Sequence, residues 1–465
     1  MQSPSSCLQH HAHKLSKAAL SELIALFGNA IDPDFLDQPS HGASVRERVF
    51  TPRVAFWAFL SQILTPGSSC RYALLKVQSL ILSLKQSSIC SSTSAYCQAR
   101  CRLPQKLLHD LRQNVVEKLE KQIQPGDLWM KRHVKIVDAT SASLPDTAKN
   151  QKQWPQPAEQ KPGCGFPVVK ICALFSLATG ALIANVQSHL NVYDGRLFPK
   201  PWKWLSDGDV ILADRAFCSF ATISSLLKRN VDSVFRLHQA RSVDFRKGKR
   251  LGKNDHLVRW KKPPQRTETM SEKIFNSLPD ELWLREIKFS IDIPGFRTRK
   301  VYLVTTLLNP KIYPLSSLAE LFRKRWNAEL NFRDIKTTMG MEHLRSQSPS
   351  MALKELTVFF IAYNLIRLIM FEAARKNRVK LQSISFKGTV DLLTSCAWLF
   401  RQHLLKKRLR SDLLRLIAYD ALPHRPDRSE PRAIKRRPKS YQYLTKPRRL
   451  MKTIPHREHY RKKSA

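Results

Sequence analysis

The chain has 465 residues, 43% of them hydrophobic, which is enough for two or three domains with their own cores and excludes an intrinsically disordered protein. Its 79 lysines and arginines outnumber 37 acidic residues, for a formal net charge of +42. Such an excess favours a polyanionic partner, with nucleic acid as the first candidate and an anionic membrane surface as the second.

The membrane alternative finds no support along the chain. The first residues lack a basic segment followed by an apolar one, as an export signal requires. The most apolar stretch, VFFIAYNLIRLIMF from Val358, is interrupted by Asn364 and Arg367 and is typical of a core helix. The nine cysteines are scattered and odd in number, which fits a reducing compartment, and Cys97 and Cys101 have no second pair at zinc-site spacing.

Residues 1–125 are expected to form a helical N-terminal domain that binds or positions DNA. An amphipathic helix is predicted at 15–27, and another at 54–64 after Pro52, which suits the first turn of a helix. A further helix is predicted over 106–122, before the breaking pair Pro125-Gly126.

Residues 126–375 are expected to form an α/β catalytic domain with a mixed sheet. Apolar, β-branched segments lie at 133–140, 169–190 and 207–214, with a hairpin break at Thr179-Gly180 in the second. A helix at 217–228 and a strand at 231–237 follow. Between about 238 and 308 the strand patterns persist in a basic context, which predicts a β-rich insertion in this domain.

A single helix is then predicted from Leu318 to Gly340, beginning with a capping box at Ser317 and Glu320. Spacings of three, four and seven residues place four side chains on one face of that helix. A buried face should be apolar, but this one carries a carboxylate between two cations: Phe322, Arg325, Glu329 and Lys336.

Residues 376–465 are expected to form a helical C-terminal region that ends in a basic tail. From Arg428 onward there are 14 lysines and arginines against 2 acidic residues. The tail is expected to be disordered when free and to bind phosphates without sequence preference.

Two further acids end strand-like runs: Asp138 ends KIVD and Asp214 ends VILAD. Carboxylates from neighbouring strand ends, joined by Glu329 from a helix packed on the sheet, would suit two Mg²⁺ or Mn²⁺ ions, which prefer hard oxygen ligands. Two such ions can activate an attacking oxygen and stabilise the leaving one on a phosphodiester. Taken singly, each Asp also fits a turn former and Glu329 a surface ion-pair partner.

Together these residues resemble the DDE transposases of bacterial insertion sequences, in the branch marked Y-x2-R-x3-E-x6-K. The helix matches the signature through Phe322, Arg325, Glu329 and Lys336, with Phe in place of the Tyr. The segments VDATSASLPDT around Asp138 and ADRAFCS around Asp214 also resemble the family. The likeness extends over about residues 40–375.

The resemblance implies an RNase H-like core with a β-rich insertion before the Glu-bearing helix. It implies a cytoplasmic, nucleoid-associated bacterial enzyme that binds the terminal inverted repeats of its element. It further implies metal-dependent cleavage and strand transfer on double-stranded DNA by a homodimer. Asp138, Asp214 and Glu329 would be the catalytic metal ligands, with Phe322, Arg325 and Lys336 contacting the substrate.

Members of the family that pass through a hairpin intermediate stack a flipped base on an aromatic residue of the insertion, and Trp260, in DHLVRWKKP, matches that position. The alternative is a tryptophan packed in the insertion's own core. At Phe322 the chain lacks the hydroxyl of the family's Tyr, which would weaken end binding by about 1 kcal/mol.

Two other functions remain open from the residues alone. One is a catalytically silent, transposase-derived DNA-binding protein, although no acid is missing. The other is a two-metal nuclease that cleaves without joining, because both reactions use the same site.

Overall fold

The computed structural model describes residues 49–83, 91–238, 240–266, 270–291, 300–397 and 406–422, with a few isolated positions nearer the two ends. The helix predicted at 15–27 and the basic tail from Arg428 fall almost entirely outside the described residues.

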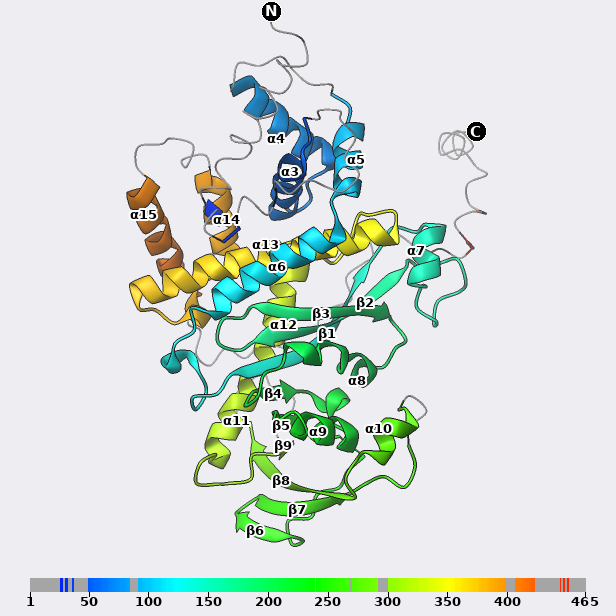
Figure 1. The fold of residues 1–465 in the computed structure, drawn as a ribbon, viewed down its shortest axis with the longest axis vertical. Helices are drawn as coiled ribbons and strands as arrows, with labels where there is room; N and C mark the ends of the chain where they lie inside the picture. Colours follow the sequence, from blue (N-terminus) through cyan, green and yellow to red (C-terminus); the bar gives the residue numbers. More distant parts are fainter. Residues whose placement is uncertain are drawn as a thin grey trace, which may run out of the picture.

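Among the described residues, four α-helices precede the sheet: α3 (Pro52–Leu64), α4 (Cys70–Ser83), α5 (Ser94–Arg102) and α6 (Gln105–Glu120). The predicted helices at 54–64 and 106–122 are confirmed. Pro52 takes the first turn of α3, where its missing N–H costs nothing, and Thr51 accepts a capping hydrogen bond of 3.2 Å from the Val54 backbone N–H. Helices α3 and α6 pack against the long helix α13 (Pro349–Asn377) (Figure 1).

One mixed sheet runs through the molecule in the order β3-β2-β1-β4-β5-β9-β8-β7-β6. Strands β1, β4 and β5 are parallel to one another, and the other pairings are antiparallel. The strand bounds are β1 Val134–Ser143, β2 Val168–Ser176, β3 Leu182–His189, β4 Val210–Ala213, β5 Asp232–Arg236, β6 Lys249–Gly252, β7 Asp255–Lys261, β8 Glu281–Ser290 and β9 Lys300–Thr305.

The sheet separates two hydrophobic cores, because successive strand residues point to opposite faces. Ile136 of β1 belongs to the core shared with α13, whereas Val137 belongs to the core on the other face. Short helices lie beside the strands: α7 (Ala148–Gln153), α8 (Asp194–Leu197), α9 (Phe220–Leu227) and α10 (Glu272–Asn276). The α/β class with a mixed sheet and helices at both ends of the chain is confirmed.

The predicted β-rich insertion does not form a separate sheet. Strands β6 to β9 continue the edge of the catalytic sheet, because β9 pairs directly with β5 over Val234–Arg236. The insertion also contains the helix α10, which the strand patterns did not predict. The insertion is therefore held to the rest of the domain by main-chain hydrogen bonds.

Helix α13 is long and apolar enough to cross a membrane by composition alone, but 94% of its most apolar window is buried within the protein. Its polar residues pair with the β2–β3 hairpin. The Asn364 side chain accepts from the Leu182 N–H at 2.8 Å and donates to the Leu182 carbonyl at 3.1 Å, and Arg367 Nε donates to the Thr179 carbonyl at 3.1 Å. The predicted core helix is confirmed, and its polar groups are satisfied by the sheet.

The prediction of a single helix from Leu318 to Gly340 is wrong in two respects. It starts earlier, at Leu315 after Pro314, without the capping box. It is also divided into α11 (Leu315–Lys324), α12 (Trp326–Arg333) and a π-helical turn (Asp334–Thr338), with Arg325 at the joint. A π turn adds a residue to the helical repeat and so rotates Lys336 away from the α-helical register. In the part of the chain that the structure describes, α13 is followed by the α-helices α14 (Phe386–Cys396) and α15 (Lys406–Tyr419).

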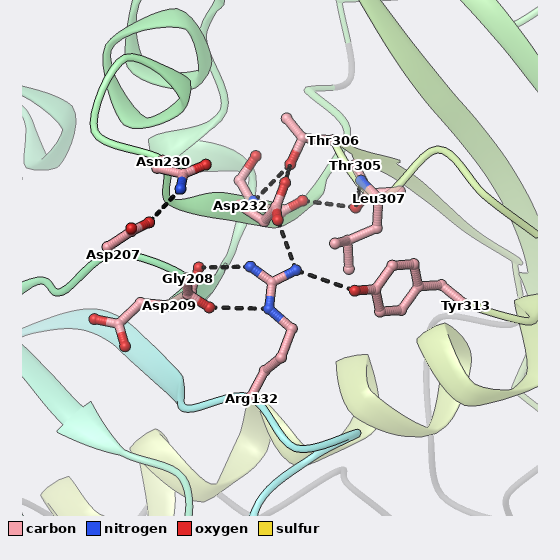
Figure 2. A network of polar contacts seen from close by, with 11 residues as sticks. Arg132, Asp207, Gly208, Asp209, Asn230, Asp232, Thr305, Thr306, Leu307 and Tyr313 are labelled. Carbon is pink, nitrogen blue, oxygen red and sulfur yellow. Dashed lines mark hydrogen bonds and ion pairs between the residues drawn. The ribbon is translucent and has the colours of Figure 1, made fainter.

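A polar network around Arg132 ties together the strands at the edge where β1, β4 and β5 begin (Figure 2). The Arg132 guanidinium lies 2.6 Å from an Asp232 carboxylate oxygen and donates to the Gly208 carbonyl and to the Tyr313 hydroxyl. Asp232 in turn accepts from the Thr306 hydroxyl at 2.5 Å. The side chains at the N-terminal ends of β1, β4 and β5 are therefore occupied by structural contacts.

A buried ion pair fixes β7 and β8 to the loop that leads into α11. Arg285 is fully buried and donates to both carboxylate oxygens of Asp255, at 2.8 and 2.6 Å. It also donates to the Tyr313 carbonyl at 2.7 Å. The Arg285 guanidinium thus links two strands of the insertion to the loop before α11 and α12.

Candidate active site

Asp138 and Asp214 lie side by side because of the parallel pairing of β1 with β4. The register pairs Val134 with Val210 and Ile136 with Leu212, and the same offset places Asp138 level with Asp214, one residue past the end of β4. Adjacent strands are about 4.8 Å apart. Asp214 therefore follows the end of β4, and Asp138 lies beside it within β1, which continues to Ser143, so the expectation that Asp138 ends its strand is wrong.

Glu329 lies on α12, which packs against β1. Arg325, one turn earlier, donates a 2.8 Å hydrogen bond from Nη2 to Glu329 Oε1. The Arg325 side chain is only 12% exposed, whereas that of Glu329 is 39% exposed. The buried guanidinium thus holds a more accessible carboxylate beside the sheet.

The pKa of Asp138 is influenced by both of the other acids. Burial raises the pKa of Asp138 to about 6. A hydrogen bond of 2.8 Å from the Ala139 N–H and the positive charge of Arg325 act in the opposite direction, whereas the charges of Glu329 and Asp214 raise the pKa further. Asp138 therefore lies within electrostatic reach of Asp214, Glu329 and Arg325.

The raised pKa predicts a pH-dependent stability of the metal-free protein. Because the folded-state pKa lies above the ordinary value of 3.8, folding favours protonated Asp138, so the unfolding free energy falls as pH rises from about 4 to 6. Asp138→Asn should therefore stabilise the protein by about 1–2 kcal/mol at pH 7.5, and by about a third of that at pH 4.5. Urea unfolding in EDTA at both pH values measures this, and an equal effect at both would contradict it.

One carboxylate oxygen of Asp214 is available to bind a cation. Its Oδ1 is buried without a hydrogen-bond partner, and the nearest cation, Arg236 Nη1, lies 3.8 Å away. A buried oxygen without a donor is what a cation ligand requires, so the donor set fits a hard divalent metal. Within the described ranges, no group of three or more His, Cys, Asp or Glu side chains is close enough to hold an ion as it stands. In this arrangement Arg325 supplies the positive charge.

Phe322 and Lys336, the other two residues predicted to share a helix face with Arg325 and Glu329, differ in their surroundings. Phe322 is 8% exposed and packs edge-on against Phe289 of β8, with ring centroids 6.4 Å apart. The Arg325 guanidinium lies 5.9 Å from the Phe322 ring, which therefore supports Arg325. Lys336 is half-buried on the π turn.

Trp260 lies in β7 but is only 5% exposed and belongs to a hydrophobic core. The alternative of a tryptophan packed within the insertion is therefore the one that this structure matches. Its Nε1 donates to Glu286 Oε1 at 2.8 Å, and the Arg241 guanidinium covers its ring at 3.7 Å. The exposed indole of the insertion is that of Trp283, at 48%.

Sequence reasoning missed Arg236, which ends β5 beside Asp214. The signal was present, because a charged residue closes the apolar run VDSVFR just as Asp138 and Asp214 close theirs. Arg241 was also missed, and nothing in its irregular, basic surroundings singled it out.

The fold and the site define a class: a mixed-sheet α/β protein with aspartates level with each other on two parallel strands, a glutamate on a helix packed against one of these strands, and a large excess of basic residues. The transposase DDE domain model matches residues 129–365, just over half of the chain, and the protein belongs to that family. It is a transposase, and enzymes of this family use divalent metal ions.

Two comparisons extend beyond the family model. The chain is 24% identical to the transposase InsG of insertion sequence element IS4 from Escherichia coli strain K12 over 451 residues, which are 93% of this chain and 96% of the relative. It is also similar to the piggyBac transposase in a synaptic complex with hairpin DNA, with a TM-score of 0.43, 13% identity and 88% of each chain covered.

Proposed function

We propose that the protein binds the terminal inverted repeats of an insertion sequence and catalyses metal-dependent DNA cleavage and strand transfer. Asp138, Asp214 and Glu329 are the catalytic residues and would hold two Mg²⁺ or Mn²⁺ ions. The observation that carries the proposal is the placement of the acids: the parallel register sets Asp138 level with Asp214, and α12, which carries Glu329, packs against β1. Two bound ions would supply an activated attacking oxygen and charge stabilisation of the leaving one.

The chain's own residues position the DNA for this reaction. Arg325, supported by the Phe322 ring, can exchange Glu329 for a phosphate oxygen of the substrate. Lys336 contacts a phosphate from the neighbouring π turn as a mobile point charge. Hydrolysis at the element end frees a 3′-hydroxyl, and attack of that hydroxyl on target DNA transfers the strand.

The partner is double-stranded DNA, both element ends and target, in the bacterial cytoplasm. The net charge of +42 supports this, because neutralising phosphates releases counterions and favours binding. Pairing of two element ends requires two active sites, so the DNA-bound form is a homodimer.

Incubation of the protein with labelled duplexes carrying the two ends of its own element, followed by product mapping at nucleotide resolution, tests the proposal. In Mg²⁺ we expect nicks at the element termini and joined molecules when target DNA is present. In EDTA we expect binding without products. Fragments without joined molecules would indicate a nuclease, and binding without any cleavage would indicate the silent DNA-binding protein.

A further inference from the structure

A basic pocket with a volume of about 450 Å³ adjoins the site at Asp214. It lies where β4 and β5 end and β9 begins, and its lining includes Arg215, Arg236, His238, Arg241, Lys300 and Tyr302. None of the lining residues that the structure describes is acidic. The volume lies within the range of about 300–1,000 Å³ typical of ligand pockets.

Two of its cations are held in place by the surrounding structure. Arg236 lies 3.8 Å from Asp214, which links the pocket directly to the three acids. Arg241 is exposed but stacks on the buried ring of Trp260 at 3.7 Å. Stacking on an indole orients a guanidinium while its N–H donors remain free to bind an anion.

The support under Arg241 is itself fixed by buried hydrogen bonds. Trp260 Nε1 donates to Glu286 Oε1 at 2.8 Å, and the other oxygen of Glu286 lies 3.0 Å from His256 Nε2. Glu286 and His256 are 7% and 1% exposed. A buried polar chain of this kind restricts the ring to one orientation, and so restricts the cation stacked on it.

Like charges gathered in a concave site repel one another unless an anion joins them. The ordinary alternative, a solvated basic surface, would spread its cations and would not place one on a buried indole. The lining includes Arg215, the residue after Asp214, and Arg236, which lies 3.8 Å from Asp214, so a DNA strand with one phosphodiester at the acids would reach the pocket with its next phosphates.

We propose that this pocket binds the phosphate of a nucleotide adjacent to the scissile one, with Arg241 as a phosphate-binding residue and Trp260 as its positioning residue. Trp260 then serves as the support of an arginine, and an unpaired base has no access to its ring. The inference rests on the proposed function, because it takes DNA cut at the three acids as the ligand.

The test measures affinity by fluorescence anisotropy in EDTA, with the labelled element-end duplex carrying one neutral methylphosphonate at each phosphate near the cleavage position in turn. In the wild type, one or two neighbouring substitutions should weaken binding about tenfold. Arg241→Gln should weaken binding of the unmodified duplex by a similar factor. It should also abolish the further loss at those same phosphates, because the contact is already gone.

Arg259→Gln is the matched control. Arg259 also stacks on an indole of the insertion, that of Trp283 at 5.4 Å, but it precedes Trp260 in β7 and so points to the opposite face of the sheet. It removes the same charge and should retain the full methylphosphonate effect. Equal behaviour of the two variants, or a wild type insensitive to every methylphosphonate, would overturn the proposal.

Trp260→Phe separates positioning from packing. The substitution keeps a ring under Arg241 but removes the hydrogen-bond donor to Glu286. As a single substitution it should lower the affinity for the duplex about threefold, and in the Arg241→Gln background it should not lower that affinity further. Additive losses would show a merely structural role. If binding behaves as expected but the wild-type protein does not cleave the unmodified duplex in Mg²⁺, the assignment of the pocket stands and the proposed function is refuted.

Discussion

Asp138→Asn and Glu329→Gln should each lower the rate of cleavage at the element ends on the order of 10³–10⁴-fold. Each change removes one carboxylate charge from a group of three acids that would hold divalent ions, while the shape of the side chain is kept. Affinity for the same duplex in EDTA should stay within about twofold, because these acids repel DNA more than they bind it. Product mapping in Mg²⁺ and anisotropy in EDTA give the two measurements.

Asp334→Asn supplies the matched control. Burial raises the pKa of Asp334 to about 6, as it does for Asp138, but Asp334 faces a separate cavity of about 350 Å³ that it shares with Arg367. The variant should cleave within a few-fold of the wild-type rate. Wild-type cleavage by Asp138→Asn would refute the assignment, and equal loss in Asp334→Asn would mean that damage to the fold explains the result.

Asp255→Ala should lower the unfolding free energy by about 3–5 kcal/mol. The substitution leaves the Arg285 guanidinium fully buried with its charge uncompensated. It should also destabilise the loop that leads into α11, because Arg285 donates a hydrogen bond to the Tyr313 carbonyl in that loop. Urea unfolding followed by circular dichroism measures the change, together with the rate of cleavage by the folded fraction.

An exposed ion pair in the same insertion gives the comparison. Arg259 and Glu281 lie 3.5 Å apart with side chains 58% and 43% exposed, so Glu281→Ala should cost less than about 1 kcal/mol. Replacing both buried partners, in Asp255→Leu with Arg285→Met, should recover part of the loss because no charge is left unpaired. A cost below 1 kcal/mol for Asp255→Ala alone would contradict the role given to this pair.

Local pattern was sufficient for much of the architecture. The apolar run that ends in Asp214 is strand β4, and the run that ends in Asp138 is the first half of strand β1, since β-branched residues strongly favour strands. The spacing of Arg325 and Glu329 sets them one helical turn apart, and their hydrogen bond follows from it. Chain order and residue type thus determined the mixed α/β class, the three acids and the family resemblance.

Long-range pairing decided the rest. The parallel register that brings Asp138 level with Asp214 joins residues 76 positions apart, and no local pattern encodes such an offset. The π turn that rotates Lys336 is set by packing. Pairing of β9 with β5 merges the insertion into the sheet, and the packing of β7 on that edge buries Trp260 beneath Arg241. An alternating strand shows which residues share a face, but only tertiary packing determines which face is covered.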